Sequence, residues 1–265
     1  MKIKLPKRKA DTHKGDYGKV LIVAGSPGMT GAAVLASRGA LRSGAGLVYL
    51  SVPKELVNFV DTITPEVITL SFDQIKDIKP DAVAIGPGLG TSDRARNALS
   101  SVVSRPSSVI IDADAINILA KNPNLLEKSK ANLILTPHPG EMGRLIGKSV
   151  QYVQANRIKV AKDAAKKFNC IVVLKGNKTV VASPSGKNYV NSTGNPGMAK
   201  GGMGDVLTGM IAGLSGQGIS PWDAAVAGVY LHGLAGDLAA KEKGEYSMTA
   251  SDLIDKVPNA IQQLH

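Results

Sequence analysis

The chain has 265 residues, of which 43% are hydrophobic and only 4% aromatic, and its formal net charge is +11. No linker, charge block or low-complexity tract divides it, so we expect one domain spanning residues 1–265, in which Val, Ile, Leu, Ala and Met favour the α/β class. The apolar runs are short and interrupted by glycine or charge, which excludes a membrane-spanning segment and a membrane partner.

The basic start, MKIKLPKRKA, is followed by no apolar segment or cleavage site, so we expect no secretory signal. The lone Cys170 cannot form an internal disulfide and should pack as a small apolar side chain, which favours a reducing, cytoplasmic location. The positive charge suits either nucleic acids or small anions. Aromatic residues do not alternate with the basic ones, so we expect a solvated basic surface and no nucleic-acid partner.

From residue 19 onward, β-branched runs alternate with helix-forming segments. We expect buried parallel strands at KVLIVAG, LVYLSV, AVAIG, SVIIDAD, NLILTPH and CIVVLKG. Helices are expected over residues 29–43, 92–104 and 150–168, which gives the βαβ rhythm of a doubly wound sheet. The run KTVVASPSGKNYVN then predicts a hairpin at one end of the sheet, and helices are expected over 203–215, 221–242 and 249–264.

Segments rich in glycine, proline and acidic residues directly follow the expected strands: GSPGMTG, GPGLG, DADAIN, TPHPGE and KGNKT. The carboxyl ends of parallel strands share one edge of a sheet, so we expect these segments to meet and form a binding site. None has the P-loop pattern, which excludes a P-loop NTPase. The glycine spacing of GSPGMTG also disfavours a Rossmann dehydrogenase.

Residues 191–213, NSTGNPGMAKGGMGDVLTGMIAG, lead from a glycine-rich turn into an apolar helix. Gly201, Gly202 and Gly204 allow backbone N–H groups to turn inward, and the N-terminus of the helix behind them is partly positive. This pattern is typical of an anion site for a transferring phosphoryl group. Asp205 is either the reactive carboxylate of that site or only a helix cap, and the residues alone give the two interpretations equal weight.

The segment GNPGMAKGGMGDVLTGMIAGL, together with IGPGLG, DADAIN, LTPHPGEMGRL and VVLKGNKTVVA, resembles the ADP-dependent NAD(P)H-hydrate dehydratase family, in collinear order over nearly the whole chain. The resemblance implies a ribokinase-like three-layer αβα sandwich with a mostly parallel central sheet. It also implies an activity: dehydration of the S epimer of hydrated NADH or NADPH, by phosphorylation of the hydroxyl from ADP and elimination, with release of AMP, phosphate and NAD(P)H.

The resemblance assigns roles to single positions. It implies that Asp205 accepts the proton of the hydroxyl, while the N–H groups of residues 201–204, with Gly202 and Gly204 as catalytic positions, hold the developing charge. It assigns nucleotide binding to Lys175, Gly176, Asn177, Lys178, Thr179 and Gly204, and substrate binding to Ala40, Gly90, His138 and Asp205. Without the resemblance, a solvated lysine at a hairpin entry would be the favoured interpretation of Lys175.

Other candidate residues have plain structural alternatives. Ala40 and Gly90 also suit helix packing and a tight turn. For Asp112 and Asp114, helix capping is favoured over binding of a metal or a ribose. Glu141 either orients a magnesium ion or caps the next helix, and the first is favoured because nucleotide phosphates generally arrive with Mg²⁺.

Two positions depart from the family pattern, which usually has Thr or Ser in place of Met203 and often Thr in place of Lys200. Met203 should cost little because the anion site uses backbone N–H groups, and Lys200 is expected to attract phosphate. The histidines His13, His232 and His265 look ordinary. None has a second His or Cys at ligand spacing, so we expect no zinc site and no metal held by the protein alone.

The resemblance further implies Mg²⁺ as cofactor, ADP as co-substrate and a homotetramer. The chain has no room for an additional N-terminal domain, so we expect functional pairing with a separate NAD(P)H-hydrate epimerase. The main alternative is a kinase of the same fold for a small alcohol such as a vitamin precursor, against which TPHPGE and GNPGMA discriminate. A basic nucleic-acid-binding protein is the remote alternative.

Overall fold

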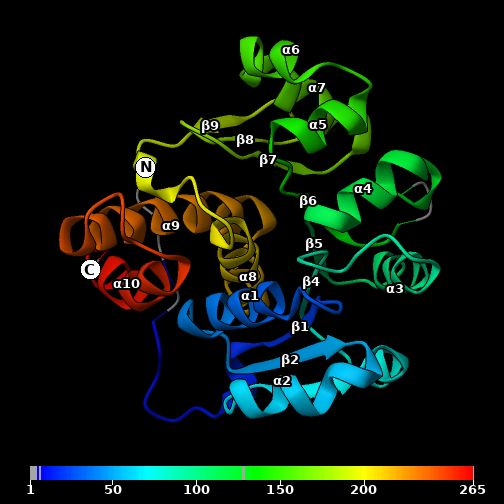
Figure 1. The fold of residues 1–265 in the computed structure, drawn as a ribbon, viewed down its shortest axis with the longest axis vertical. Helices are drawn as coiled ribbons and strands as arrows, with labels where there is room; N and C mark the ends of the chain where they lie inside the picture. Colours follow the sequence, from blue (N-terminus) through cyan, green and yellow to red (C-terminus); the bar gives the residue numbers. More distant parts are fainter. Residues whose placement is uncertain (1–4, 6, 127–128, 265) are drawn as a thin grey trace.

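The structure, a computed structural model, describes residues 5, 7–126 and 129–264, so residues 1–4 and 6 of the basic start, and His265, lie outside the described residues. A nine-stranded sheet forms its centre, in the order β3-β2-β1-β4-β5-β6-β7-β8-β9 (Figure 1). The strands from β3 to β7 in this order are parallel, and β8 and β9 join antiparallel. The strands are β1 Lys19–Val23, β2 Leu47–Val52, β3 Ile68–Ser71, β4 Ala82–Ile85, β5 Ser108–Ile111, β6 Asn132–Leu135, β7 Ile171–Leu174, β8 Val180–Ala182 and β9 Asn188–Val190.

The α-helices are α1 Thr30–Arg42, α2 Val57–Ile63, α3 Asp93–Val103, α4 Ala113–Lys121, α5 Pro139–Ile146, α6 Val150–Ala155, α7 Arg157–Phe168, α8 Met203–Gly216, α9 Pro221–Lys243 and α10 Ala250–Gln262. In the part of the chain that the structure describes, none of them is long and apolar enough to cross a membrane.

The sequence predicted most of these elements. Each predicted strand is confirmed, and the predicted hairpin is β8 and β9. The single helix expected over 150–168 is wrong, because Asn156 leaves the helical conformation between α6 and α7 and its amide donates to the Tyr152 carbonyl at 3.0 Å. The predicted burial of Cys170 is confirmed, and burial raises the pKa of its thiol to about 12.

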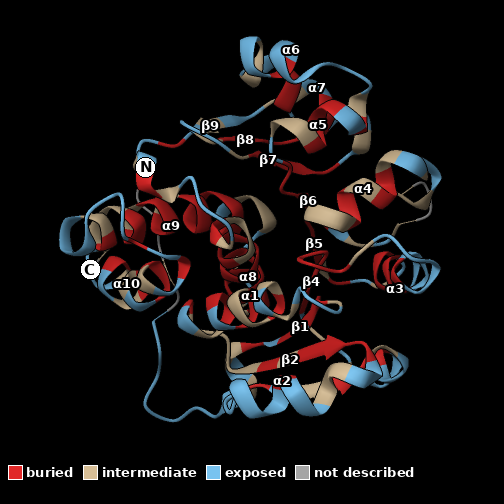
Figure 2. Cartoon of the chain, viewed as in Figure 1, coloured by how far each residue is buried: buried red, intermediate tan, exposed pale blue. Residues whose placement is uncertain are grey.

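Helices cover both faces of the sheet, as the burial in Figure 2 shows. The alternation along β1 divides the core. Leu21 and Val23 pack in the cluster that includes residues of α3, α4, α5 and α7, whereas Val20 and Ile22 pack in the cluster that includes residues of α1, α8 and α9. The expected three-layer αβα sandwich is therefore confirmed. At β1 the strand order reverses, with β2 on one side and β4 on the other, which is where open α/β sheets usually bind ligands.

Helices α1 and α8 cross at very short range, and glycine makes this possible. A Cβ atom at Gly209 would overlap the carbonyl oxygen of Ala36, and one at Gly213 would overlap the side chain of Ser43. The Ser43 hydroxyl also reaches the Met210 carbonyl at 3.3 Å. Because α8 also packs against β1, β4 and β5, its N-terminus is fixed relative to the carboxyl ends of these strands.

We predict that Gly209→Ala destabilises the protein by at least about 3 kcal/mol, because the added methyl group forces α1 and α8 apart. The matched control is Gly31→Ala in the first turn of α1, where a Cβ meets nothing within 4 Å. The free energy of unfolding of that variant should equal that of the wild type or exceed it by up to about 1 kcal/mol. Urea unfolding measures both values, and equal stability of the two variants would contradict the packing argument.

Candidate active site

The loops after β1, β4, β5, β6 and β7 meet at one edge of the sheet, as predicted. The Gly25 N–H donates to the Pro87 carbonyl at 2.9 Å, and the Ser26 hydroxyl donates to the Gly88 carbonyl at 2.8 Å. On the other side, the Lys175 N–H donates to the Pro137 carbonyl at 2.9 Å. These bonds join the loop after β1 to the loop after β4, and the loop after β6 to the loop after β7.

A buried ion pair lies at this edge. Lys175 Nζ, at the end of β7, donates to Asp112 Oδ1 at 2.5 Å, and the second oxygen of Asp112 accepts from the Thr208 hydroxyl at 2.7 Å. Asp112 is 1% exposed. Burial alone would lower the pKa of the Lys175 ammonium, but the charges of Asp112, Glu141 and Asp205 outweigh it and raise the pKa, so Lys175 stays charged. The solvated-lysine interpretation is wrong.

The favoured capping interpretation of Asp112 is also wrong. Asp112 occupies the N-cap position of α4, but its side chain makes no capping bond and is used by Lys175 and Thr208 instead. The following residue, Ala113, has a left-handed φ of 47°, an uncommon backbone conformation that stores strain at this point of the loop. Asp114 does not cap the helix either, because its carboxylate accepts from the Gly90 N–H at 2.8 Å.

The glycine turn ends at a helix whose first N–H groups are free. Gly202, the N-cap of α8, has a left-handed φ of 88° and offers no side chain. The Val206 N–H donates to the Gly202 carbonyl at 3.1 Å, whereas the N–H groups of residues 201–205 donate to no backbone acceptor in the described part of the chain. A Cβ at Gly204 would lie 3.2 Å from Lys175 Nζ, so glycine leaves space between the helix and the ammonium group. The arrangement suits an anion.

Asp205 follows in the first turn of α8. Burial, and next the charge of Asp112, raise the pKa of the Asp205 carboxyl to about 7, with smaller increases from Asp114 and Glu141, although the charge of Lys175 acts in the opposite direction. A carboxyl group with this pKa is present in both protonation states near neutral pH. It can therefore accept a proton and release it again, which a fully solvated aspartate does poorly.

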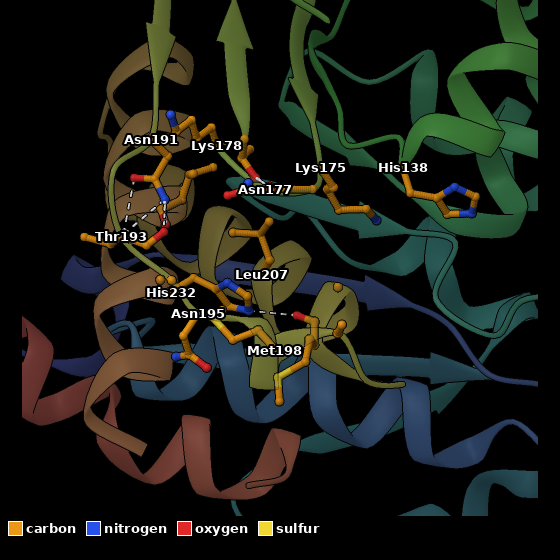
Figure 3. Close-up of a pocket in the computed structure, with 18 of the residues that line it drawn as sticks. His138, Lys175, Asn177, Lys178, Asn191, Thr193, Asn195, Met198, Leu207 and His232 are labelled. Atoms are coloured by element: carbon orange, nitrogen blue, oxygen red, sulfur yellow. Dashed lines mark hydrogen bonds between the residues drawn. The ribbon is translucent and has the colours of Figure 1, made fainter. Parts of the chain in front are cut away.

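A cavity of about 750 Å³ opens beside this turn (Figure 3). Its wall includes His138, Gly204 and the whole predicted nucleotide-binding stretch of Lys175, Gly176, Asn177, Lys178 and Thr179. The stretch is a tight turn in which Lys178 has a left-handed φ of 52° and the Thr179 hydroxyl donates to the Gly176 carbonyl at 2.9 Å. The structure thus brings together most of the residues that the sequence selected.

His138 and Glu141 are used by their own helix. His138 Nδ1 accepts from the Gly140 and Glu141 N–H groups, and its Nε2 lies 3.1 Å from Glu141 Oε1. The His138 N–H donates to Glu141 Oε2 at 2.8 Å. Burial alone would raise the pKa of Glu141, but the bonds from His138 and the charge of Lys175 hold it below its usual value. Helix capping, the less favoured alternative for Glu141, is therefore confirmed.

The structure does not place Ala40 in the wall of the cavity. Ala40 is fully buried in α1, where its carbonyl accepts from the Ser43 hydroxyl at 3.1 Å and lies against Gly213 of α8. Lys200 does not project into the cavity as a free charge, because its Nζ donates to the carbonyls of Tyr246 and Met248. The side chain of Met203 is 4% exposed and packs in a core cluster with residues of α9 and α10.

Sequence reasoning missed the other wall of the cavity. It is formed by the loop after β9 and by α9, and includes Asn191, Thr193, Asn195 and His232. Asp237 of α9 holds this loop by accepting from the Gly194 N–H at 2.9 Å and the Asn195 amide at 3.0 Å. Asn191, Thr193 and Asn195 belong to the segment 191–213 that the sequence singled out, but they received no role there, and His232 looked ordinary.

Comparisons with known proteins agree with this geometry. The NAD(P)H-hydrate dehydratase family model matches residues 20–259. The chain belongs to this family. It is 39% identical to the ADP-dependent (S)-NAD(P)H-hydrate dehydratase of Bacillus subtilis, over 96% of this chain and 92% of that protein. It is 43% identical to the bifunctional NAD(P)H-hydrate repair enzyme of Moorella thermoacetica, over 98% of this chain but only 52% of that protein. The chain therefore spans about half the length of the bifunctional relatives that it matches.

Comparison with solved structures gives the same fold. The crystal structure of an ADP/ATP-dependent NAD(P)H-hydrate dehydratase from Bacillus subtilis, co-crystallised with ATP and Mg²⁺, is 38% identical, with a TM-score of 0.90 over 98% of this chain and 95% of that one. A ribokinase-like superfamily protein from Enterococcus faecalis, 27% identical, has a TM-score of 0.86 over 98% of this chain and 92% of its own. The expected ribokinase-like fold is confirmed.

We predict that Asp205→Asn stabilises the dehydratase fold at alkaline pH. The folded pKa of about 7 lies above the unfolded value of about 3.9, so the native state binds more protons between these values and loses stability as the pH rises through them. After allowance for solvent screening, the gain should be about 1–3 kcal/mol larger at pH 8.5 than at pH 4. Urea unfolding at both pH values measures it, and a gain independent of pH would contradict the raised pKa.

Proposed function

We propose that this chain catalyses the ADP-dependent dehydration of the S epimer of hydrated NADH or NADPH, restoring NADH or NADPH. One observation carries the proposal: Asp205, with a pKa of about 7, stands in the first turn of α8 beside unpaired N–H groups, and its neighbour Gly204 lines the same cavity as Lys175. A proton acceptor next to an anion site is the arrangement that phosphoryl transfer to a hydroxyl requires. The family membership supports the choice of hydroxyl.

The chemistry follows from the poor leaving ability of hydroxide. The hydroxyl oxygen of the hydrated nicotinamide ring attacks the β-phosphorus of ADP, Asp205 accepts the hydroxyl proton, and the bond to AMP breaks. The phosphorylated ring then expels phosphate and loses a ring proton, so the ring double bond returns. The free N–H groups of Met203, Gly204 and Asp205 stabilise the charge that develops on the transferred group, and the Lys175 ammonium adds to this.

The cavity places the nucleotide. The turn of residues 175–179 and the glycine turn of α8 form facing parts of its wall, so a diphosphate between them reaches the N-terminus of α8. A volume of about 750 Å³ is sufficient for one nucleotide. The loop of Gly90 follows β4, two strands away from β6 and three from β7, and the Gly90 N–H donates to the Asp114 carboxylate. We infer that the hydrated dinucleotide approaches Asp205 from the side of this loop.

The residues fit a magnesium ion that arrives on the nucleotide phosphates. Within residues 5, 7–126 and 129–264, no group of three or more His, Cys, Asp or Glu residues could hold a metal ion. The oxygens of Asp112 and Glu141 are already used by hydrogen bonds within the protein. When bound, Mg²⁺ would neutralise phosphate charge, and the nucleotide phosphates would be its main ligands.

We further propose that the chain forms one domain, works in the cytoplasm, assembles as a homotetramer and uses ADP with Mg²⁺. Relatives that carry both repair activities in one polypeptide support functional pairing with an epimerase. Neither NADH hydrate nor NADPH hydrate is favoured by a residue of the site, so both are proposed as substrates.

The activity has a direct test. Purified protein, hydrated NADH, Mg²⁺ and ADP should restore the absorbance of the dihydronicotinamide and release AMP and phosphate in equal amounts. The control omits ADP. No ADP-dependent recovery would overturn the proposal, and accumulation of a stable phosphorylated alcohol from a vitamin precursor would instead favour the kinase alternative.

We predict that Asp205→Asn lowers kcat by at least about 100-fold, because the amide cannot accept the hydroxyl proton. The Kd for ADP should change by less than about threefold, since the cavity wall stays intact. The matched control is Asp61→Asn on the exposed surface of α2, which should keep wild-type turnover. Steady-state kinetics and calorimetric titration with ADP give both values. Turnover of Asp205→Asn close to that of the control would remove Asp205 from its role.

A further inference from the structure

A buried histidine faces the nucleotide cavity. His232 of α9 is 7% exposed, and its Nε2 lies 2.8 Å from the carbonyl oxygen of Met203, the first residue of α8 (Figure 3). A carbonyl oxygen can only accept a hydrogen bond, so Nε2 carries the proton of this ring. The tautomer of His232 is therefore fixed by its partner.

The His232 ring is neutral. Burial lowers the pKa of the imidazole to about 4, the charge of Lys175 lowers it further, and the bond to Met203 opposes them without reversing the result. With the proton on Nε2, the other ring nitrogen, Nδ1, is an acceptor with a free lone pair.

Nδ1 has no partner within the part of the chain that the structure describes. The only hydrogen bond of the ring there is the one from Nε2. Nδ1 is not among the fully enclosed side-chain nitrogen and oxygen atoms without partners, and His232 lines the cavity, so the lone pair is accessible from the cavity. An accessible acceptor in a cavity wall can be satisfied by water or by a donor of a bound ligand.

The polar neighbours of His232 in this wall are already satisfied. Asn191 donates to the carbonyl and hydroxyl of Thr193, both at 3.0 Å, and the Thr193 hydroxyl donates to the Tyr230 carbonyl at 2.9 Å. Asn195 is bonded on both sides, by its donation to Asp237 at 3.0 Å and by acceptance from the Gly197 N–H at 3.0 Å. These side chains shape the wall, and His232 presents an acceptor to the space they enclose.

We propose that His232 Nδ1 accepts a hydrogen bond from an N–H or O–H donor of the bound nucleotide and thereby determines which nucleotides the cavity takes. The inference rests on the proposed function only in that the cavity binds ADP. Such an acceptor favours a ligand with a donor at this point and disfavours one with an acceptor there, since two acceptors leave both unpaired. The donor is a ribose hydroxyl or the amino group of adenine.

Calorimetric titration distinguishes these sources. The ligands are ADP, 2′-deoxy-ADP, 3′-deoxy-ADP and purine riboside 5′-diphosphate, which lacks the amino group. The variants are His232→Gln, whose longer amide can keep the bond to Met203 without the acceptor at Nδ1, and His232→Asn, whose amide oxygen can replace Nδ1. His13→Gln, the same change at an exposed histidine, is the control.

We expect one analogue to bind the wild type and His13→Gln about tenfold more weakly than ADP. This ratio should fall to about one in His232→Gln and return in His232→Asn, and the analogue that behaves so names the donor. Ratios that are the same in the wild type and His232→Gln for every analogue would overturn the proposal, because a purely structural histidine does not couple to a ligand group.

A second measurement needs no variant. In ¹⁵N NMR of histidine-labelled wild-type protein, Nδ1 of His232 should resonate as an unprotonated nitrogen and shift to lower frequency when ADP binds. A protonated Nδ1, or one that ADP does not shift, would overturn the proposal. No ADP binding to the wild type would overturn both this proposal and the proposed function. ADP binding with the expected coupling, but without turnover of hydrated NADH, would overturn the proposed function alone.

Discussion

The ion pair between Lys175 and Asp112 joins the carboxyl ends of β7 and β5, and both of its charges affect the pKa of the Asp205 carboxyl. The second carboxylate oxygen of Asp112 accepts a hydrogen bond from the Thr208 hydroxyl of α8. The same carboxylate therefore also connects the sheet to the helix that carries Asp205. Removing one partner of a buried pair usually costs about 3–5 kcal/mol, since the other charge is left uncompensated. Lys175 can interact with a phosphate while staying in place, because Asp112 has already oriented it.

Burial and the charge of Asp112 explain how a carboxyl group and an anion site can be neighbours. An ionised Asp205 would repel a phosphate, but burial and the charge of Asp112 raise its pKa to about 7, so its negative charge is easily lost. The glycine contacts between α1 and α8 fix the N-terminus of α8, and the bond from His232 to Met203 holds its first turn from the opposite side. Fold and site are thus linked through one helix.

The sequence predicted the layers and the loops at the sheet edge because both depend on local patterns, namely β-branched runs and the glycine and acidic residues that follow them. The same patterns marked the glycine turn before Asp205, but the roles of Asp205, Lys175 and the turn after β7 came from the family resemblance. The role of Asp112 was not predictable, because it depends on Thr208, which is 96 residues away. His232 was missed since a histidine within an apolar helix carries no local signal. The complete burial of Ala40 was not predictable, because packing against α8 is a property of the folded protein.

The account depends most directly on the protonation of Asp205. Its pKa can be measured by ¹³C NMR on aspartate-labelled protein, with the Asp205→Asn variant identifying the resonance. We expect this carboxyl to titrate near pH 7 in the free protein, far above the reference value of about 3.9 for aspartate. A value below about 5 would contradict the account, because Asp205 would then carry a permanent charge beside the anion site and would be a weak proton acceptor.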